Sequence, residues 1–288
     1  MMNRLVVNLT PTGMVPTKEM TPHVPLSVDE IVSDVARCVE LHGITMVHLH
    51  ARDERGEPTW SREVYAKLIG GIRDFAPDLV VCVSLSGRNV QDIDKRADPL
   101  LLEGGLKPDM GSLTLSSMNF SMQASVNPPD TVQELARRMQ NRGILPELEA
   151  FDLGMVNYGQ FLIGRGLVRQ PSYWNLFLGS IAGAQAELAH AGLMARDVPS
   201  KALWSFGGIG DAQLAAHGFA VAAGGGVRVG LEDSIYHDAS RKDLATNEGL
   251  VRRAVHLGEI FGRKVMRPAQ FREIMGLEKG NGSYGLPR

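Results

Sequence analysis

Short apolar runs alternate with amphipathic stretches along the whole chain, and this alternation most constrains the fold. Several of the runs are continuously apolar and rich in β-branched residues, which is typical of parallel strands buried on both faces. The strands should therefore lie side by side in one parallel sheet. Candidate strands occur at residues 5–9, 45–49, 79–85, 110–113, 147–151, 174–178, 202–206 and 227–231.

Helical patterns separate these candidate strands. They cover residues 28–41, 62–75, 91–103, 130–142, 158–165, 181–191, 212–223 and 247–261. Ser27 is a good N-cap for the first helix, and Glu30 stands at the capping-box position. About eight strand–helix units in a chain near the ~250 residues typical of the fold predict an α/β protein, a single-domain (β/α)8 TIM barrel over residues 1–288. An open doubly wound sheet is the alternative, but no G-x-G-x-x-G motif follows the first strand.

The amino-acid composition argues against some classes of binding partner. Thirty basic and 32 acidic residues give a net charge of −2, and no basic run stands out, so neither nucleic acid nor an anionic membrane is an implied partner. No apolar run reaches the roughly 18 residues of a membrane helix. Residues 1–4 and the short apolar run after them lack the features of a signal peptide. With Cys38 and Cys82 as the only cysteines, a reducing cytoplasm is expected.

Two candidate strands end in residues that can bind a metal ion. His48 and His50 are two positions apart, so both imidazoles face the same side of the second strand. Glu232 ends the eighth strand, and closure of a barrel places the second and eighth strands on either side of the first. Two histidines and a carboxylate with an open fourth position suit a catalytic Zn2+. Fe2+ or Mn2+ would fit equally, and hydrogen-bonded histidines beside a solvated acidic pair are the structural alternative.

Carboxylates and hydroxyls occur at other strand ends. Glu147 and Glu149 share one face of the fifth strand. Buried charges need partners, so these two either pair with a cation or contact substrate. Ser84 lies at the end of the third strand, and Ser86 and Arg88 follow it.

Glycines follow the seventh strand. Gly208 and Gly210 lie where TIM barrels often bind phosphate, which would suit a phosphate-bearing co-substrate. Glycine is also simply what a tight turn requires. Both interpretations remain open from the sequence.

Taken together, these motifs resemble the β-keto acid cleavage enzymes, the family of 3-keto-5-aminohexanoate cleavage enzyme. The resemblance implies a zinc-dependent TIM barrel, usually a homotetramer, that converts a β-keto acid and acetyl-CoA into acetoacetate and a new acyl-CoA. The motifs that carry it lie at residues 17–18, 22–25, 48–52, 56–59, 108–113, 119–120, 146–152 and 227–233.

The resemblance also implies residue roles. It places the metal on His48, His50 and Glu232, in agreement with the interpretation from strand ends. It gives proton abstraction to Asp233 with Arg228 and Ser84. Substrate contacts fall to Ser112 and to one of Glu147 and Glu149.

Two departures from the family pattern bear on the substrate. The family position that receives a substrate amine is occupied by Val15, so a cationic substrate would lose its partner. The family's Ser-Thr-Gly-Gly turn becomes Ser84-Leu85-Ser86-Gly87-Arg88. Arg88 could bind a second substrate carboxylate, or it could pair with a surface acid.

Three other functions compete with this interpretation. A hydrolase of the amidohydrolase type also uses an H-x-H pair, but on its first strand. An aldolase or lyase that needs no CoA would use the same metal set. A non-catalytic binding barrel would keep its ligand without turnover.

Overall fold

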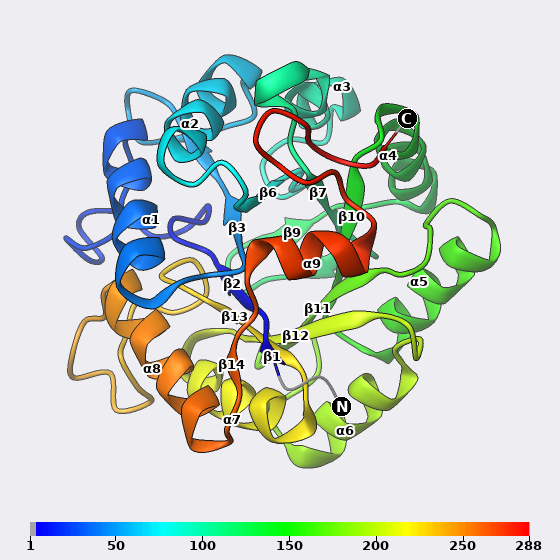
Figure 1. Ribbon diagram of the computed structural model, residues 1–288. Helices are drawn as coiled ribbons and strands as arrows, with labels where there is room; N and C mark the ends of the chain where they lie inside the picture. The colour runs from blue at the N-terminus through cyan, green and yellow to red at the C-terminus, as the bar shows by residue number, and fades with distance from the viewer. Residues whose placement is uncertain (1–3, 288) are drawn as a thin grey trace.

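The computed structural model describes residues 4–287 and contains a closed barrel of parallel strands (Figure 1). This confirms the predicted TIM barrel. The expectation for the N-terminal residues 1–3 lies outside the described residues. In barrel order, the strands are β2 (Val7–Leu9), β3 (Met46–Leu49), β6 (Val80–Val83), β7 (Met110–Thr114), β10 (Leu145–Ala150), β11 (Tyr173–Leu178), β12 (Leu203–Gly208) and β13 (Gly226–Val229).

Strand β2 lies between β13 and β3, as closure of the barrel requires. Asn8 of β2 is in register with Arg228 on one side and with Met46 on the other. Every residue of β3 and β6 is buried, because one face of each strand points into the barrel and the other packs under helices. The ends of the second and eighth barrel strands are therefore neighbours across a single narrow strand.

Helices surround the barrel (Figure 1). The first begins with the predicted capping box: the Ser27 hydroxyl accepts from the Glu30 amide at 3.2 Å, and the Glu30 carboxylate accepts from the Ser27 amide at 3.1 Å. The main helices are α1 (Val28–His42), α2 (Arg62–Phe75), α4 (Pro129–Arg142), α5 (Leu153–Gly164), α6 (Leu188–Asp197), α7 (Gln213–Ala223) and α8 (Asn247–Ile260).

Three predicted helices were wrong in extent. The one predicted at residues 158–165 begins earlier, as α5 (Leu153–Gly164). Residues 91–103 contain the single turn α3 (Ile93–Arg96) and the 3-10 turn η1 (Asp98–Leu101), and a second 3-10 turn, η2 (Gly104–Leu106), follows them. Pro99 has no amide hydrogen to donate, and the backbone of Leu102 and Glu103 is extended, so the predicted helix is not continuous. Residues 181–187 are a loop, and α6 starts only at Leu188.

A further helix, which the strand–helix pattern does not predict, closes the N-terminal end of the barrel. Helix α9 (Pro268–Met275) lies across the barrel opening in Figure 1. Its Phe271 and Met275 pack with the first residues of barrel strands, such as Met46, Val80 and Met110. This end of the barrel is therefore filled by packed side chains, which leaves the opposite end for a binding site.

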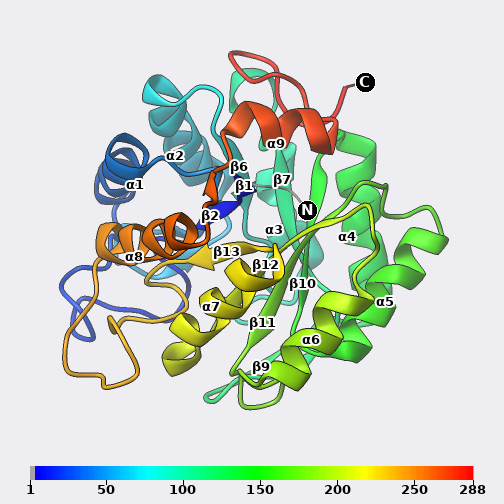
Figure 2. The ribbon, with the colours of Figure 1, turned by 60° about the horizontal axis from the view of Figure 1, so that its bottom comes forward.

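Short hairpins stand at the opposite, C-terminal end. The pairs are β4 (Ala51–Arg52) with β5 (Pro58–Thr59), and β8 (Met118–Asn119) with β9 (Ala124–Ser125). Figure 2 shows α9 and the β9 hairpin at opposite ends of the barrel. A further pair of parallel strands consists of β1 (Arg4–Leu5) and β14 (Lys264–Val265). Within residues 4–287, no helix is both long and apolar enough to cross a membrane.

Candidate active site

A cavity of about 700 Å³ opens at the C-terminal ends of the barrel strands. The βα loops form its rim, as in other TIM barrels. Most of the polar residues singled out from the sequence meet in it. Its wall includes His50, Ser84, Ser86, Arg88, Glu149, Gly210, Arg228, Glu232 and Asp233.

His48 is buried, and a carboxylate fixes its orientation. Its Nδ1 lies 2.5 Å from Oε2 of Glu147, which is itself fully buried. Burial lowers the pKa of His48, but the charges of Glu147 and Glu232 and the hydrogen bond to Glu147 together outweigh burial, so the net shift is upward. Glu147 also accepts from the Asn8 amide at 2.8 Å and from the Cys82 thiol at 3.2 Å. Glu147 therefore acts on His48 from inside the barrel and is not part of the cavity wall.

Glu232 meets the second histidine across strand β2. Its Oε1 lies 3.1 Å from Nε2 of His50 and 2.6 Å from a terminal nitrogen of Arg228. Burial would raise the pKa of Glu232, but Arg228, His50 and His48 together hold it well below its usual value. Gly13, at a φ of +66°, allows this approach, because a Cβ there would lie 2.5 Å from Cγ of Glu232.

His48, His50 and Glu232 can hold one metal ion. One ligand atom from each lies within 4.8 Å of the others. Among the described residues, Nε2 of His48 and Oε2 of Glu232 are buried without a hydrogen-bond partner. Such groups are costly unless something else satisfies them, and a divalent ion does so. The donor set fits Zn2+, Fe2+ or Mn2+.

The same histidine belongs to a second cluster. His48, Cys82 and Glu147 also place ligand atoms within 4.8 Å of one another. Their distances are those of direct hydrogen bonds, and the cluster uses the Nδ1 side of His48. We therefore interpret Glu147 and Cys82 as the support for His48 on the side away from the cavity.

Arg228 is the electrostatic centre of the site. Its Nε lies 3.1 Å from Oδ2 of Asp233, and one terminal nitrogen lies 3.8 Å from Oε1 of Glu149. Burial lowers the pKa of Arg228, but the surrounding carboxylates raise it well above its usual value, so the guanidinium stays charged. Burial raises the pKa of Asp233 to about 6, although Arg228 opposes the shift. Burial also raises the pKa of Glu149.

The serines differ in their access to the cavity. Ser84 and Ser86 line it, and the Ser84 hydroxyl accepts from the Ser86 amide at 3.3 Å. Ser112 does not line it; its buried hydroxyl accepts from the Leu85 amide at 3.0 Å and so positions the loop after β6. Ser84 can therefore contact a ligand directly, whereas Ser112 lies behind the wall.

Gly208 and Gly210 both have structural reasons to be glycine. A Cβ at Gly208 would lie 2.4 Å from Cα of Gln213, and Gly210 adopts a φ of +58°. The Gly210 amide donates to the Asp233 carbonyl at 2.7 Å. These glycines hold the β12 and β13 loops together, and their contact with a phosphate stays a prediction.

Sequence reasoning missed an aromatic wall in the cavity. Phe120 meets Phe151 edge to face at 5.5 Å between centroids, and Phe151 stacks on Phe177 at 4.3 Å. All three rings line the cavity, although they come from three separate segments. Phe151 and Phe177 each lie at or near the end of a predicted strand, and this position could have indicated that they line the cavity. Phe120 lies between β8 and β9.

Arg52 was also missed. Its guanidinium donates to the carbonyl of Gly13 at 2.7 Å and to that of Pro16 at 3.2 Å. It thereby ties the first βα loop to the end of the second strand, beside His50. The signal was its position two residues after His50.

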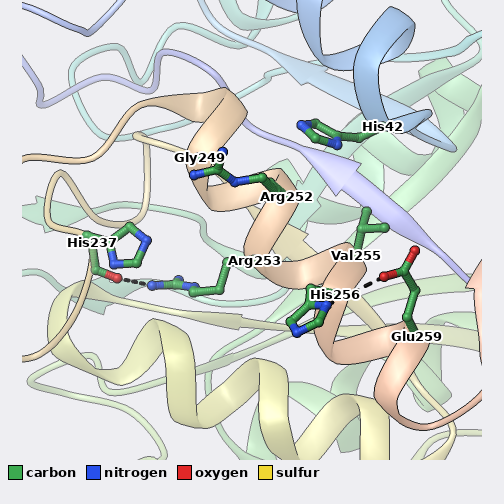
Figure 3. Close-up of a pocket in the computed structure, with 8 residues that line it drawn as sticks. All are labelled: His42, His237, Gly249, Arg252, Arg253, Val255, His256 and Glu259. Atoms are coloured by element: carbon green, nitrogen blue, oxygen red, sulfur yellow. Dashed lines mark hydrogen bonds and ion pairs between the residues drawn. The ribbon is translucent and has the colours of Figure 1, made fainter.

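A second cavity, of about 430 Å³, lies against α8 (Figure 3). In Figure 3 the Arg253 side chain reaches the His237 carbonyl, and His256 points toward Glu259, 3.5 Å away. None of its lining residues belongs to the metal triad or to the larger cavity. The chemistry indicated by the strand ends is therefore confined to the larger cavity.

A parallel barrel with two histidines, a glutamate and a buried arginine–aspartate pair at its strand ends belongs to the class of TIM-barrel enzymes, here with residues that could hold a metal ion. Within that class, the chain is a member of the beta-keto acid cleavage enzyme family, whose model matches residues 4–277. This confirms the resemblance drawn from the motifs.

Relatives of established name cover the chain almost completely. It is 32% identical to the 3-keto-5-aminohexanoate cleavage enzyme of Fusobacterium nucleatum, over 97% of this chain and 100% of the relative. It is 33% identical to the 3-oxoadipate:acetyl-CoA acetyltransferase of Cupriavidus necator, over 94% of each. The solved complex of ObcA with oxaloacetate has a TM-score of 0.76 at 17% identity, over 89% of this chain and 68% of that one, which bears on the fold alone.

Proposed function

We propose that the chain cleaves a β-keto acid with acetyl-CoA, producing acetoacetate and the acyl-CoA of the remaining fragment. The acetyl group leaves the CoA sulfur and bonds to C2 of the keto acid. The bond between C2 and C3 then breaks, and the acyl group at C3 passes to the CoA sulfur. One observation carries the proposal: the carboxylate of Asp233, fixed by Arg228, lines one cavity together with His50 and Glu232 of the metal-ligand triad.

A divalent ion on His48, His50 and Glu232, which we propose to be Zn2+, would supply Lewis acidity that stabilises the negative charge left when a C2 proton departs. Asp233 would accept that proton. The Nε contact with Arg228 aims one Asp233 oxygen, and Ser84 offers a hydroxyl to the reacting group. Glu149, with one oxygen bonded to Thr114 at 2.7 Å, would orient the substrate. Arg228 keeps these carboxylates at fixed positions.

We also propose that the enzyme is a cytoplasmic homotetramer. Both cysteines are free and buried, which suits a reducing compartment. Ile181 and Leu188, 73% and 74% exposed, are large apolar side chains on the β11–α6 side that a subunit interface would cover. Sedimentation velocity would measure the oligomeric state, and a monomer at micromolar concentration would contradict this part of the proposal.

The decisive experiment measures acetoacetate formation from a panel of β-keto acids, with and without acetyl-CoA and with and without metal. We expect product only when both are present. Product without acetyl-CoA would favour a lyase instead. No product from any member, in folded and metal-loaded protein, would contradict the proposal and favour a hydrolase.

Asp233→Asn should reduce kcat by about 10²- to 10⁴-fold, the usual contribution of a general base. Asp238→Asn is the matched control, since Asp238 lies in the same loop, is exposed and does not line the cavity. It should change kcat by less than about threefold. Equal effects of the two substitutions would remove Asp233 from the reaction.

A further inference from the structure

Arg88 is a cation in the cavity wall that lacks an acidic partner. It lies in the loop between β6 and α3, and its guanidinium carbon lies 3.7 Å from the centroid of Phe120. Its Nε is buried without a hydrogen-bond partner. Within residues 4–287, no carboxylate forms an ion pair with it. Glu232, Glu149 and Asp233 act on it only at longer range. Burial of a charged guanidinium costs free energy unless an anion neutralises the charge, and a bound ligand can supply that anion.

Each carboxylate that lines the same cavity lies close to an arginine. Glu232 and Asp233 pair with Arg228 at 2.6 and 3.1 Å, and Glu149 lies 3.8 Å from the same guanidinium. Asp211 pairs with Arg241 at 2.6 Å. The cavity therefore has no free carboxylate for a cationic substrate, whereas it has one free guanidinium for an anionic substrate.

An apolar wall separates Arg88 from the catalytic end. Phe120 contacts Phe151, Phe151 stacks on Phe177, and the guanidinium of Arg228 lies 4.9 Å from the centroid of Phe177. The row of rings thus begins at Arg88 and ends at Arg228. A ligand that contacts both ends must carry an apolar spacer along this row.

We propose that Arg88 binds a second, distal carboxylate of the substrate, so that the preferred substrate is a dicarboxylic β-keto acid with a methylene spacer. The inference rests on the proposed β-keto acid cleavage. The keto acid end lies at the metal triad and Arg228, the methylenes lie on the phenylalanine rings, and the far carboxylate takes a bidentate contact from Arg88. The phosphates of CoA have the same oxygen chemistry, and the experiment separates the two sources.

The test compares 3-oxoadipate with 3-oxohexanoate, which share a six-carbon chain and differ only in the distal carboxylate. For the wild type, kcat/KM should be at least about tenfold higher for the dicarboxylate. Arg88→Gln should lower that ratio by about 10- to 100-fold, the range for loss of a charge-assisted hydrogen bond. Arg88→Lys should restore part of it. The KM for acetyl-CoA should not change with either substitution.

Arg241→Gln is the matched control, because Arg241 also lines the cavity but already pairs with Asp211. It should leave the ratio of the two kcat/KM values unchanged. A wild type that cleaves both acids without preference would overturn the inference and leave the cleavage reaction standing. A rise in KM for acetyl-CoA in Arg88→Gln, equal with both keto acids, would assign Arg88 to a phosphate of CoA instead.

Binding of stable analogues tests Arg88 even if no keto acid is cleaved. In calorimetry on metal-loaded protein, adipate should bind at least about tenfold more tightly than hexanoate, and Arg88→Gln should abolish the difference. Equal affinities would overturn the inference. Absence of cleavage with a normal adipate preference would instead contradict only the proposed reaction. Circular dichroism on each variant verifies that it is folded.

Discussion

At the scale of single residues, Glu147 determines which nitrogen of His48 faces the cavity. The hydrogen bond at Nδ1 leaves Nε2 directed to the triad without a protein partner. A carboxylate behind a metal-binding histidine also raises the basicity of the ligand. Asn8 and Cys82 hold the carboxylate itself in place. The geometry of the triad therefore depends on residues deep in the barrel.

Glu147→Gln should weaken zinc binding by about 10- to 100-fold, because the amide cannot accept and orient the imidazole as the carboxylate does. Competition with a chromophoric chelator measures this affinity without reference to activity. Glu149→Gln is the matched control on the same strand, since Glu149 contacts Thr114 and Arg228 and has no contact with His48. Equal losses in both variants would contradict a specific role for Glu147.

At the scale of elements, α9 closes the end of the barrel that has no site. Phe271 is fully buried and meets Tyr173 edge to face at 5.3 Å between centroids. Arg272 of the same helix holds the buried Asp109 with two contacts of 2.8 Å. The helix therefore contributes both apolar packing and a buried ion pair to the N-terminal end of the barrel.

Phe271→Ala should lower the free energy of unfolding by about 3–5 kcal/mol, the usual cost of removing a buried phenylalanine. Urea denaturation followed by fluorescence would measure it. Phe261→Ala is the control, because Phe261 is 54% exposed and surface substitutions usually change stability by about 0.5 kcal/mol or less. A loss below about 1 kcal/mol at Phe271 would mean that α9 is not part of the cooperative core.

At the scale of the whole molecule, the ring of strands brings together ligands that lie 182 residues apart in the sequence, from His50 to Glu232. A metal ion on these residues would link the second and eighth barrel strands and would bind only the folded chain. The single-domain organisation predicted from the sequence is consistent with this picture and stays a prediction.

Zinc at 100 times its dissociation constant should therefore raise the free energy of unfolding by about 2.7 kcal/mol, and removal of the ion should reverse the gain. Thermal unfolding at several free zinc concentrations would measure the effect. His50→Ala should abolish the dependence on zinc, whereas His256→Ala, an exposed histidine of α8, should preserve it. A wild type whose stability does not respond to zinc would exclude this site as the place where zinc binds.

The sequence by itself determined the barrel, the order of its strands and the proximity of His48, His50 and Glu232. The reason is that these follow from local patterns: apolar runs, the i, i+2 spacing of His48 and His50, and the closure that makes the first and last strands neighbours. The boundaries of helices were less certain where Pro99 and the loop before Leu188 interrupt the pattern.

Only the tertiary structure decided how the polar residues divide their roles. Glu147 and Glu149 share one face of one strand, yet one supports His48 and the other lines the cavity, because their depth along the barrel differs. The free charge of Arg88 and the phenylalanine row beside it arise from contacts between distant segments. A local sequence pattern does not show which charged side chains form ion pairs, because those pairs join distant segments. The substrate specificity of the cavity could therefore be inferred only from the tertiary structure.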